Sequence, residues 1–223
     1  MRLEVKIPYN KNQFLQIEKN LNSIKNLKKQ HPSRTINSVY FDNLNNQIAL
    51  DNLSGISRRC KLRVRYYGNQ ESSNCYLEIK KKLNRYGFKK IIDIKKNFNK
   101  LKIEEVFKLN NSMHKEIIKD DYAKYYVIND YLSPQVQVSY LRDYYVSNKI
   151  RITHDKEIFF KPYNIENKST LKISKDYLNV LEIKFNYEDI IDANRIIDKI
   201  SIKPKRFSKY LRGLSFFNKA IYL

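Results

Sequence analysis

The chain has 223 residues, of which 42% are hydrophobic, so it is long enough to bury a substantial core. Its 44 Lys and Arg residues exceed its 23 Asp and Glu residues, which gives a formal net charge of +21. This excess favours a polyanionic partner, namely nucleic acid, an anionic membrane surface or a phosphate-rich small molecule. The four glycines form neither a GxGxxG nor a GxxxxGK[ST] motif, which excludes the common dinucleotide-binding and P-loop classes.

The first elements predicted along the chain are a strand, a helix and a second strand. Residues 2–9 alternate, with Arg2, Glu4 and Lys6 on one face and apolar residues on the other. Apolar residues at three- and four-residue spacing predict a helix over residues 10–29, ended by a His-Pro pair. The segment SVYFDN, residues 38–43, predicts a short strand that closes on a turn.

Residues 58–82 predict a β-hairpin with one charged and one apolar face. Arg59, Lys61, Arg63 and Arg65 share one face of the first strand. A turn near residue 70 would place the two cysteines of the chain, at positions 60 and 75, too far apart along the ladder for a disulfide. Both cysteines therefore fit a reduced, intracellular protein.

The rest of the chain alternates between strands and helical segments. Helical spacing of apolar residues predicts helices at residues 98–109, 113–132, 190–200 and 207–220. Period-two patterns predict strands at residues 88–94, 135–147, 149–155, 158–163 and 178–186. No stretch of about 18 apolar residues and no signal-peptide core is present, so we expect a cytoplasmic protein.

The predicted strands carry charge on one face and apolar residues on the other. For a single hairpin, a solvated outer face is an equally good interpretation. Because helices occur between the strands and need apolar surface to cover, a closed sheet with helices outside and charged faces inside fits the whole chain. We therefore predict one α+β domain over residues 1–223, an antiparallel β-barrel tunnel with helices packed outside.

A basic lumen of this kind suits triphosphate chemistry. Phosphoryl transfer needs positioned cations around the phosphate oxygens and a divalent metal that bridges them. Glu182 is the candidate metal ligand, since hard divalent cations prefer carboxylate oxygens. The alternative for Glu182 is an ion pair with Lys184.

The ordered segments RLEVK, SVYFDN, KLRVRYY, YLEIK, SYLRDYY, IRITHD, VLEIKF and RFSKYLRG resemble the VTC-type polyphosphate polymerase domain. This domain belongs to the CYTH-like triphosphate tunnel metalloenzyme superfamily, and the resemblance runs from Arg2 to about Gly213. It implies a phosphotransferase that moves the terminal phosphate of ATP onto a growing polyphosphate chain with Mn²⁺ or Mg²⁺.

The resemblance also implies which residues act. The catalytic cations would be Lys6, Arg63, Arg65, Lys80, Arg142, Arg151 and Lys184. Further phosphate contacts would come from Lys89, Arg206 and Lys209, and Glu182 would hold the metal. Lys90 is the alternative to Lys89, which we prefer because Phe88 fits the apolar position before it.

Departures from the family pattern separate the functional alternatives. Related hydrolases begin with Glu-x-Glu-x-Lys, whereas this chain has Arg2 at the first position, which favours the polymerase branch. The alternatives are a metal-dependent triphosphatase in the same tunnel and a non-enzymatic polyanion-binding module. We expect ATP and polyphosphate as partners and no nucleic acid. Membrane association would come through a separate membrane protein partner, and the sequence leaves the oligomeric state open.

Overall fold

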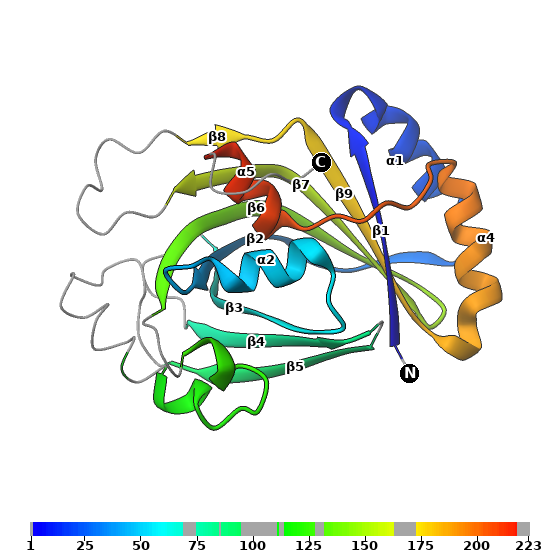
Figure 1. Cartoon of the computed structure of the whole chain (residues 1–223). Coiled ribbons are helices and arrows are strands. Elements are labelled where there is room, and N and C mark those ends of the chain that lie inside the picture. The colour runs from blue at the N-terminus through cyan, green and yellow to red at the C-terminus, as the bar shows by residue number, and fades with distance from the viewer. Residues whose placement is uncertain are drawn as a thin grey trace. The chain divides into compact units, whose positions relative to one another are not determined.

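The computed structural model describes residues 2–68, 75–84, 86–94, 111, 114–127, 132–162 and 173–217. Within these residues the strands form an antiparallel sheet in the order β1-β9-β7-β6-β2-β3-β4-β5, with β8 paired to β7 (Figure 1). No helix of this part of the chain is long and apolar enough to cross a membrane.

The strands and helices have the following bounds. The strands are β1 (Arg2–Asn10), β2 (Leu27–Asp42), β3 (Arg58–Tyr67), β4 (Tyr76–Leu83), β5 (Tyr86–Asp93), β6 (Ser133–Ser147), β7 (Ile150–Pro162), β8 (Ser174–Lys175) and β9 (Leu178–Asn186). The α-helices are α1 (Phe14–Asn22), α2 (Gln47–Ser54), α4 (Ile190–Ile200) and α5 (Lys209–Phe216). Short 3-10 helices are η1 (Lys11–Gln13), η3 (Lys124–Tyr126) and η4 (Tyr187–Asp189).

The chain divides into two compact units, and four strands, β2, β6, β7 and β8, contribute residues to both. Unit 1 comprises Met1–Thr35, Tyr140–Phe159 and Lys175–Ser208. Unit 2 comprises Ile36–Ser139, Phe160–Ser174 and Lys209–Leu223. The expectation of a single domain over residues 1–223 stays a prediction.

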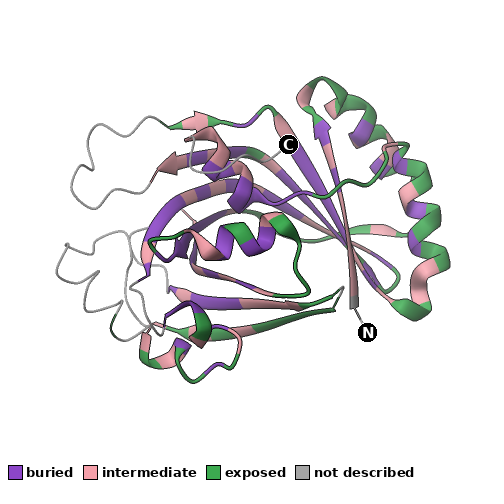
Figure 2. Cartoon of the chain, viewed as in Figure 1, coloured by how far each residue is buried: buried purple, intermediate pink, exposed green. Residues whose placement is uncertain are grey.

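In unit 1, α1 and α4 cover the apolar side of the strands. Their buried residues, such as Ile17 and Ile196, pack with Ile7, Ile152 and Ile183 of β1, β7 and β9 in one core. Figure 2 shows long buried stretches along the strands, whereas much of both helices is exposed. Successive strand residues point to opposite faces, so the charged residues of these strands lie on the side away from the two helices. The period-two patterns predicted this division of faces.

In unit 2, β3, β4 and β5 pair in the predicted register. Cys60 lies opposite Lys81, and Arg65 lies opposite Tyr76, the residue after Cys75. Both cysteines are buried free thiols. The prediction that their positions rule out a disulfide agrees with this register.

Two predictions about the N-terminal region were wrong. The helix predicted over residues 10–29 ends at Asn22. Strand β2 begins at Leu27, whereas the predicted strand was short and covered only residues 38–43. Asn26, with φ 58°, turns the chain between them. Ile24 continues the apolar spacing of the helix and is buried, because the side chain reaches the same core from this turn. Helix α2 had not been predicted.

Later elements follow the sequence patterns more closely. The strand predicted over 178–186 and the helix over 190–200 have the bounds of β9 and α4. Strand β7 replaces the two short strands predicted at 149–155 and 158–163, with a left-handed residue, Glu157, between them. The last helix is shorter than predicted and begins at Lys209. The helix predicted over 98–109 lies outside the described residues.

Candidate phosphate-binding site

Six residues of unit 1 form a charged group that we call the Glu182 cluster: Glu4, Lys6, Arg142, Asp155, Glu182 and Lys184. Strand register places these side chains together. Lys6 lies opposite Glu182, and Glu4 lies opposite Lys184, across the β1–β9 pair. Directly opposite residues of an antiparallel pair project to the same face, so charges far apart in the sequence become neighbours.

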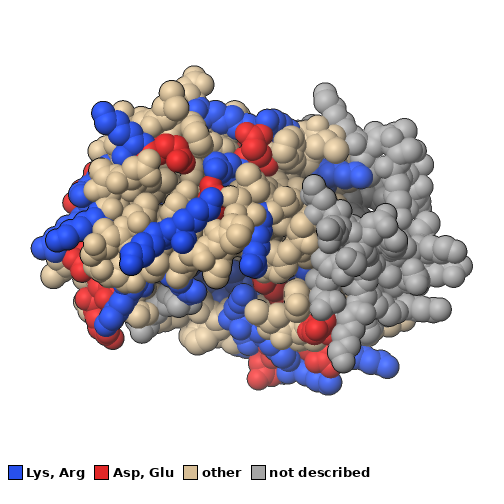
Figure 3. All heavy atoms as spheres, turned by 180° about the vertical axis from the view of Figure 1, so that it is seen from behind, with Lys and Arg blue, Asp and Glu red and all other residues tan. Residues whose placement is uncertain are grey.

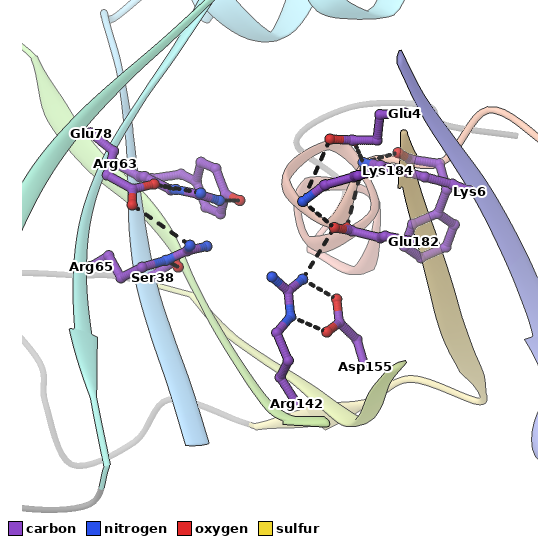
Figure 4. Close-up of polar contacts among 12 residues, drawn as sticks. Glu4, Lys6, Ser38, Arg63, Arg65, Glu78, Arg142, Asp155, Glu182 and Lys184 are labelled. Atoms are coloured by element: carbon purple, nitrogen blue, oxygen red, sulfur yellow. Dashed lines mark hydrogen bonds and ion pairs between the residues drawn. The ribbon is translucent and has the colours of Figure 1, made fainter. Parts of the chain in front are cut away.

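Two lysines and two glutamates alternate within the Glu182 cluster (Figure 4). The Nζ atom of Lys6 lies 3.4 Å from Glu4 Oε1 and 3.8 Å from Glu182 Oε1. The Nζ atom of Lys184 lies 3.7 Å from Glu4 Oε2 and 3.3 Å from Glu182 Oε2. Lys6 also donates a hydrogen bond to the carbonyl of Phe207. Each ammonium group therefore joins the two carboxylates.

Arg142 of β6 forms the most buried ion pair of this cluster. Its Nη2 donates to Asp155 Oδ2 at 2.6 Å and to Glu182 Oε2 at 3.2 Å, and its Nε donates to Asp155 Oδ1. Burial alone would lower the pKa of Arg142, but Asp155, Tyr140 and Glu182 raise it well above its ordinary value. Asp155 thus fixes the guanidinium plane, and Nη1 carries donors that these contacts do not use.

Unit 2 contains a second charged group, the Glu78 cluster: Ser38, Tyr40, Arg63, Arg65, Glu78 and Lys89. Glu78 is 2% exposed, and Arg63, the residue opposite it on β3, donates to it through Nε at 2.7 Å. Arg65 Nη1 lies 3.7 Å from the other carboxylate oxygen and its Nε donates to Ser38 (Figure 4). Arg63 Nη1 donates to the Tyr40 hydroxyl at 3.0 Å.

Positive charge exceeds negative charge in the Glu78 cluster. Lys89 lies 3.5 Å from Glu78, which makes three cations around one buried carboxylate. Burial alone would raise the pKa of Glu78, but Arg63, Arg65 and Lys89 outweigh it and lower that pKa to about 2. The pKa of Lys89 is lowered by burial and by repulsion from Arg63 and Arg65, which Glu78 only partly offsets. Among the six residues of the cluster, three cations thus stand against one carboxylate.

The remaining predicted residues lie as follows. Lys80 lies opposite Lys89 in the β4–β5 register, and Arg151 lies opposite Lys184 in the β7–β9 register. Lys209, the first residue of α5, is buried and helps to lower the pKa of Tyr40, whose burial alone would raise it. Arg206 is exposed on the segment that leads from α4 to α5. Roles for these four residues stay predictions.

Sequence reasoning missed several members of the two clusters. Ser38 and Tyr40 lie opposite Arg65 and Arg63, which the sequence did predict. Because Ser38 and Tyr40 alternate in SVYFDN, their common strand face could have been predicted as well. Asp155 likewise shares the phase of Arg151 in IRITHD. Lys89 lies 3.5 Å from Glu78, but Phe88, from which the preference for Lys89 was argued, is 55% exposed, so the choice between Lys89 and Lys90 stays a prediction.

Comparison with known proteins gives the family. The VTC domain family matches residues 2–218. The chain belongs to the VTC domain family. The resemblance to a VTC domain noted in the sequence is thereby confirmed. No curated protein matches the chain.

Several solved structures share the fold of this chain. One is HpAC1 from Hippeastrum, which was assigned as an adenylyl cyclase and has a dominant triphosphatase activity. It is 12% identical to this chain, with a TM-score of 0.55, and the match covers 99% of this chain and 98% of HpAC1. A Bacillus halodurans protein assigned as an adenylate cyclase is 12% identical with a TM-score of 0.55, over 93% and 94% of the two chains. A Pyrococcus horikoshii protein is 16% identical with a TM-score of 0.53, over 95% and 99%. The predicted α+β tunnel-type fold with an antiparallel sheet is confirmed.

Proposed function

We propose that this VTC domain is an ATP-dependent polyphosphate polymerase. The observation that carries the proposal is the excess of positive charge in the Glu78 cluster, where three cations surround one buried carboxylate. Guanidinium groups bind phosphate oxygens in pairs, and a chain of phosphates carries charge at every unit, so polyphosphate is a matched ligand. Lys and Arg side chains also spread over the surface seen in Figure 3.

The Glu182 cluster fits a different part of the same chemistry. Its two glutamates present carboxylate oxygens toward the same pair of lysines. Among the described residues no group of three or more His, Cys, Asp or Glu side chains is arranged to hold a metal ion. Mg²⁺ is commonly held by one or two carboxylates together with substrate phosphates, so Glu4 and Glu182 fit such a site. A bound Mn²⁺ or Mg²⁺ would neutralise charge on the transferred phosphoryl group.

The proposed reaction needs no protein nucleophile. A terminal oxygen of polyphosphate attacks the γ-phosphorus of ATP, the bond from that phosphorus to the bridging oxygen breaks, and ADP leaves with both electrons of that bond. The polymer gains one phosphate. In unit 2, Arg63, Arg65 and Lys89 would hold phosphate oxygens. In unit 1, Lys6, Arg142 and Lys184 would offset the charge of phosphoryl groups bound there.

A triphosphatase is the second candidate function. The pair Glu4 and Glu182 favours it, because a site that holds a divalent metal can also present water to a triphosphate. The Hippeastrum neighbour shares the fold and has a dominant triphosphatase activity. Arg2 at the position of the first hydrolase glutamate favours the polymerase.

The test is a product balance with ATP and Mn²⁺. A polymerase forms ADP and acid-insoluble polyphosphate without an equal amount of free phosphate, whereas a triphosphatase releases phosphate in step with ADP. The variant Arg63→Ala should lose most of either activity, and Arg195→Ala, on the exposed face of α4, should keep it. If the protein forms no ADP but binds polyphosphate, it is a binding module. Cytoplasmic location and a membrane protein partner stay predictions.

A further inference from the structure

Unit 2 contains a pocket that no member of the Glu78 cluster lines. Its volume is about 440 Å³, within the range of small-molecule sites, and its walls include Arg58, Arg59, Tyr122, Lys124, Tyr125 and Tyr126. Arg58 has the strand phase of the buried residues of β3 and not that of Arg63. Arg59, the next residue, has the phase of Arg63, but none of the residues proposed to bind polyphosphate lines the pocket.

Aromatic rings and a guanidinium group are combined in this pocket. The Tyr125 side chain is 70% exposed, and it meets Tyr126 edge to face at 5.4 Å. The guanidinium of Arg58 lies 4.4 Å from the ring centre of Tyr122. Exposed ring faces stack on planar heterocycles, and an arginine packed on a ring offers its plane in the same way.

The polar groups of the pocket favour an anion. Arg58 donates one hydrogen bond, to the neutral carbonyl of Asp121, and a guanidinium has five N–H donors. The two carboxylates of the pocket already have partners: Asp121 pairs with Lys124 at 2.8 Å, and Asp51 accepts hydrogen bonds from Tyr126 and Gln47. Phosphate and carboxylate are the anions that a guanidinium binds in a bidentate manner, and a phosphate attached to a planar heterocycle would also use the rings.

We propose that this pocket, which we call the Tyr122 pocket, binds a free nucleotide. The base would stack on Tyr125, and the phosphate would contact Arg58. The size, the rings and the guanidinium together match a heterocycle that carries phosphate. The site goes beyond the proposed function, since a polyphosphate polymerase needs no second nucleotide.

The test uses calorimetric titration of ADP into the whole protein, with chelator present and tripolyphosphate at saturation to fill the phosphate-binding clusters. We expect one ADP site. Tyr125→Ala should weaken it about 5–150-fold, the effect of losing one stacking ring. Arg58→Gln should weaken it about tenfold or more, since it removes charge-assisted hydrogen bonds.

Matched controls separate the pocket from general charge effects. Tyr187→Ala and Arg195→Gln remove an exposed tyrosine and an exposed arginine from unit 1 and should leave ADP binding unchanged. Adenosine and pyrophosphate should each bind more weakly than ADP. The proposal would be overturned if ADP does not bind under these conditions. It would also be overturned if Tyr125→Ala and Arg58→Gln bind ADP as tightly as the wild type does. Tighter binding of a short oligoadenylate would assign the pocket to a nucleic acid instead. Failure here leaves the product balance with ATP unaffected.

Discussion

The ion pair between Arg142 and Asp155 gives the sharpest test of the Glu182 cluster. Asp155 is fully buried, and the Arg142 side chain is 9% exposed. The change Asp155→Asn keeps the size of the side chain but removes its negative charge. Of the two carboxylates that contact the buried Arg142 guanidinium, Glu182 is then the one that remains. Removing one partner of a buried ion pair costs about 3–5 kcal/mol. Because Glu182 and an amide oxygen remain, we take about 3 kcal/mol.

This loss should appear as a lower melting temperature. For a chain of this length each kcal/mol shifts Tm by about 2–4 °C, so Asp155→Asn should melt about 6–12 °C below the wild type. The matched control is Asp192→Asn, which breaks a pair with Arg195 at 2.8 Å whose side chains are 74% and 52% exposed. An exposed pair of this type contributes about 0.3–0.5 kcal/mol, so the control should shift by about 2 °C or less.

Ligand then tests the phosphate role of Arg142. If phosphate contacts this guanidinium, tripolyphosphate supplies the anion that Asp155→Asn lacks, and its stabilising shift should be larger in the variant than in the wild type. Equal melting temperatures for Asp155→Asn and Asp192→Asn would refute the reasoning about burial. A smaller ligand shift in Asp155→Asn would refute the contact with phosphate.

Four further predictions concern the metal, the hydroxyl of Tyr40, the pH dependence and the ligand class. Glu182→Gln should abolish turnover or sharply raise the Mn²⁺ requirement, and unchanged activity across a Mn²⁺ titration would leave Glu182 as an ion-pair partner only. Tyr40→Phe removes the buried hydroxyl to which Arg63 donates and should lower turnover about tenfold or more, the effect of one lost hydrogen bond to a charged group, whereas the exposed Tyr187→Phe should not change it. The neighbouring cations lower the pKa of Glu78 to about 2, below its ordinary value. The ionised Glu78 therefore stabilises the folded state above about pH 4.5, and this stabilisation is lost as pH falls toward 2. The difference in Tm between the wild type and Glu78→Gln should shrink over that interval. Tripolyphosphate at about 100 times its dissociation constant should raise Tm by about 5–11 °C, and an equal shift from duplex DNA at matched phosphate and salt would favour a polyanion-binding module.

The sequence determined which residues share a strand face, because side-chain alternation is a property of the local backbone. The common phase of Lys61, Arg63 and Arg65 and the register of Cys60 followed from that alternation and from one turn. The ordered segments also identified the VTC domain. These features depend on residues that are neighbours in the chain.

Only the tertiary structure decided which charges meet. Glu182 of β9 contacts Lys6 of β1 and Arg142 of β6. These strands come from distant parts of the chain, and no local pattern sets the positions of β1 and β6 relative to β9. Strand β2 shows the same limit: it pairs with β3 over Ile36–Phe41, close to the strand predicted at 38–43, whereas no local pattern indicated its earlier part, which begins at Leu27. Pairing between strands depends on the whole folded sheet, so the partners of each buried charge could not be predicted from periodicity, although its face could.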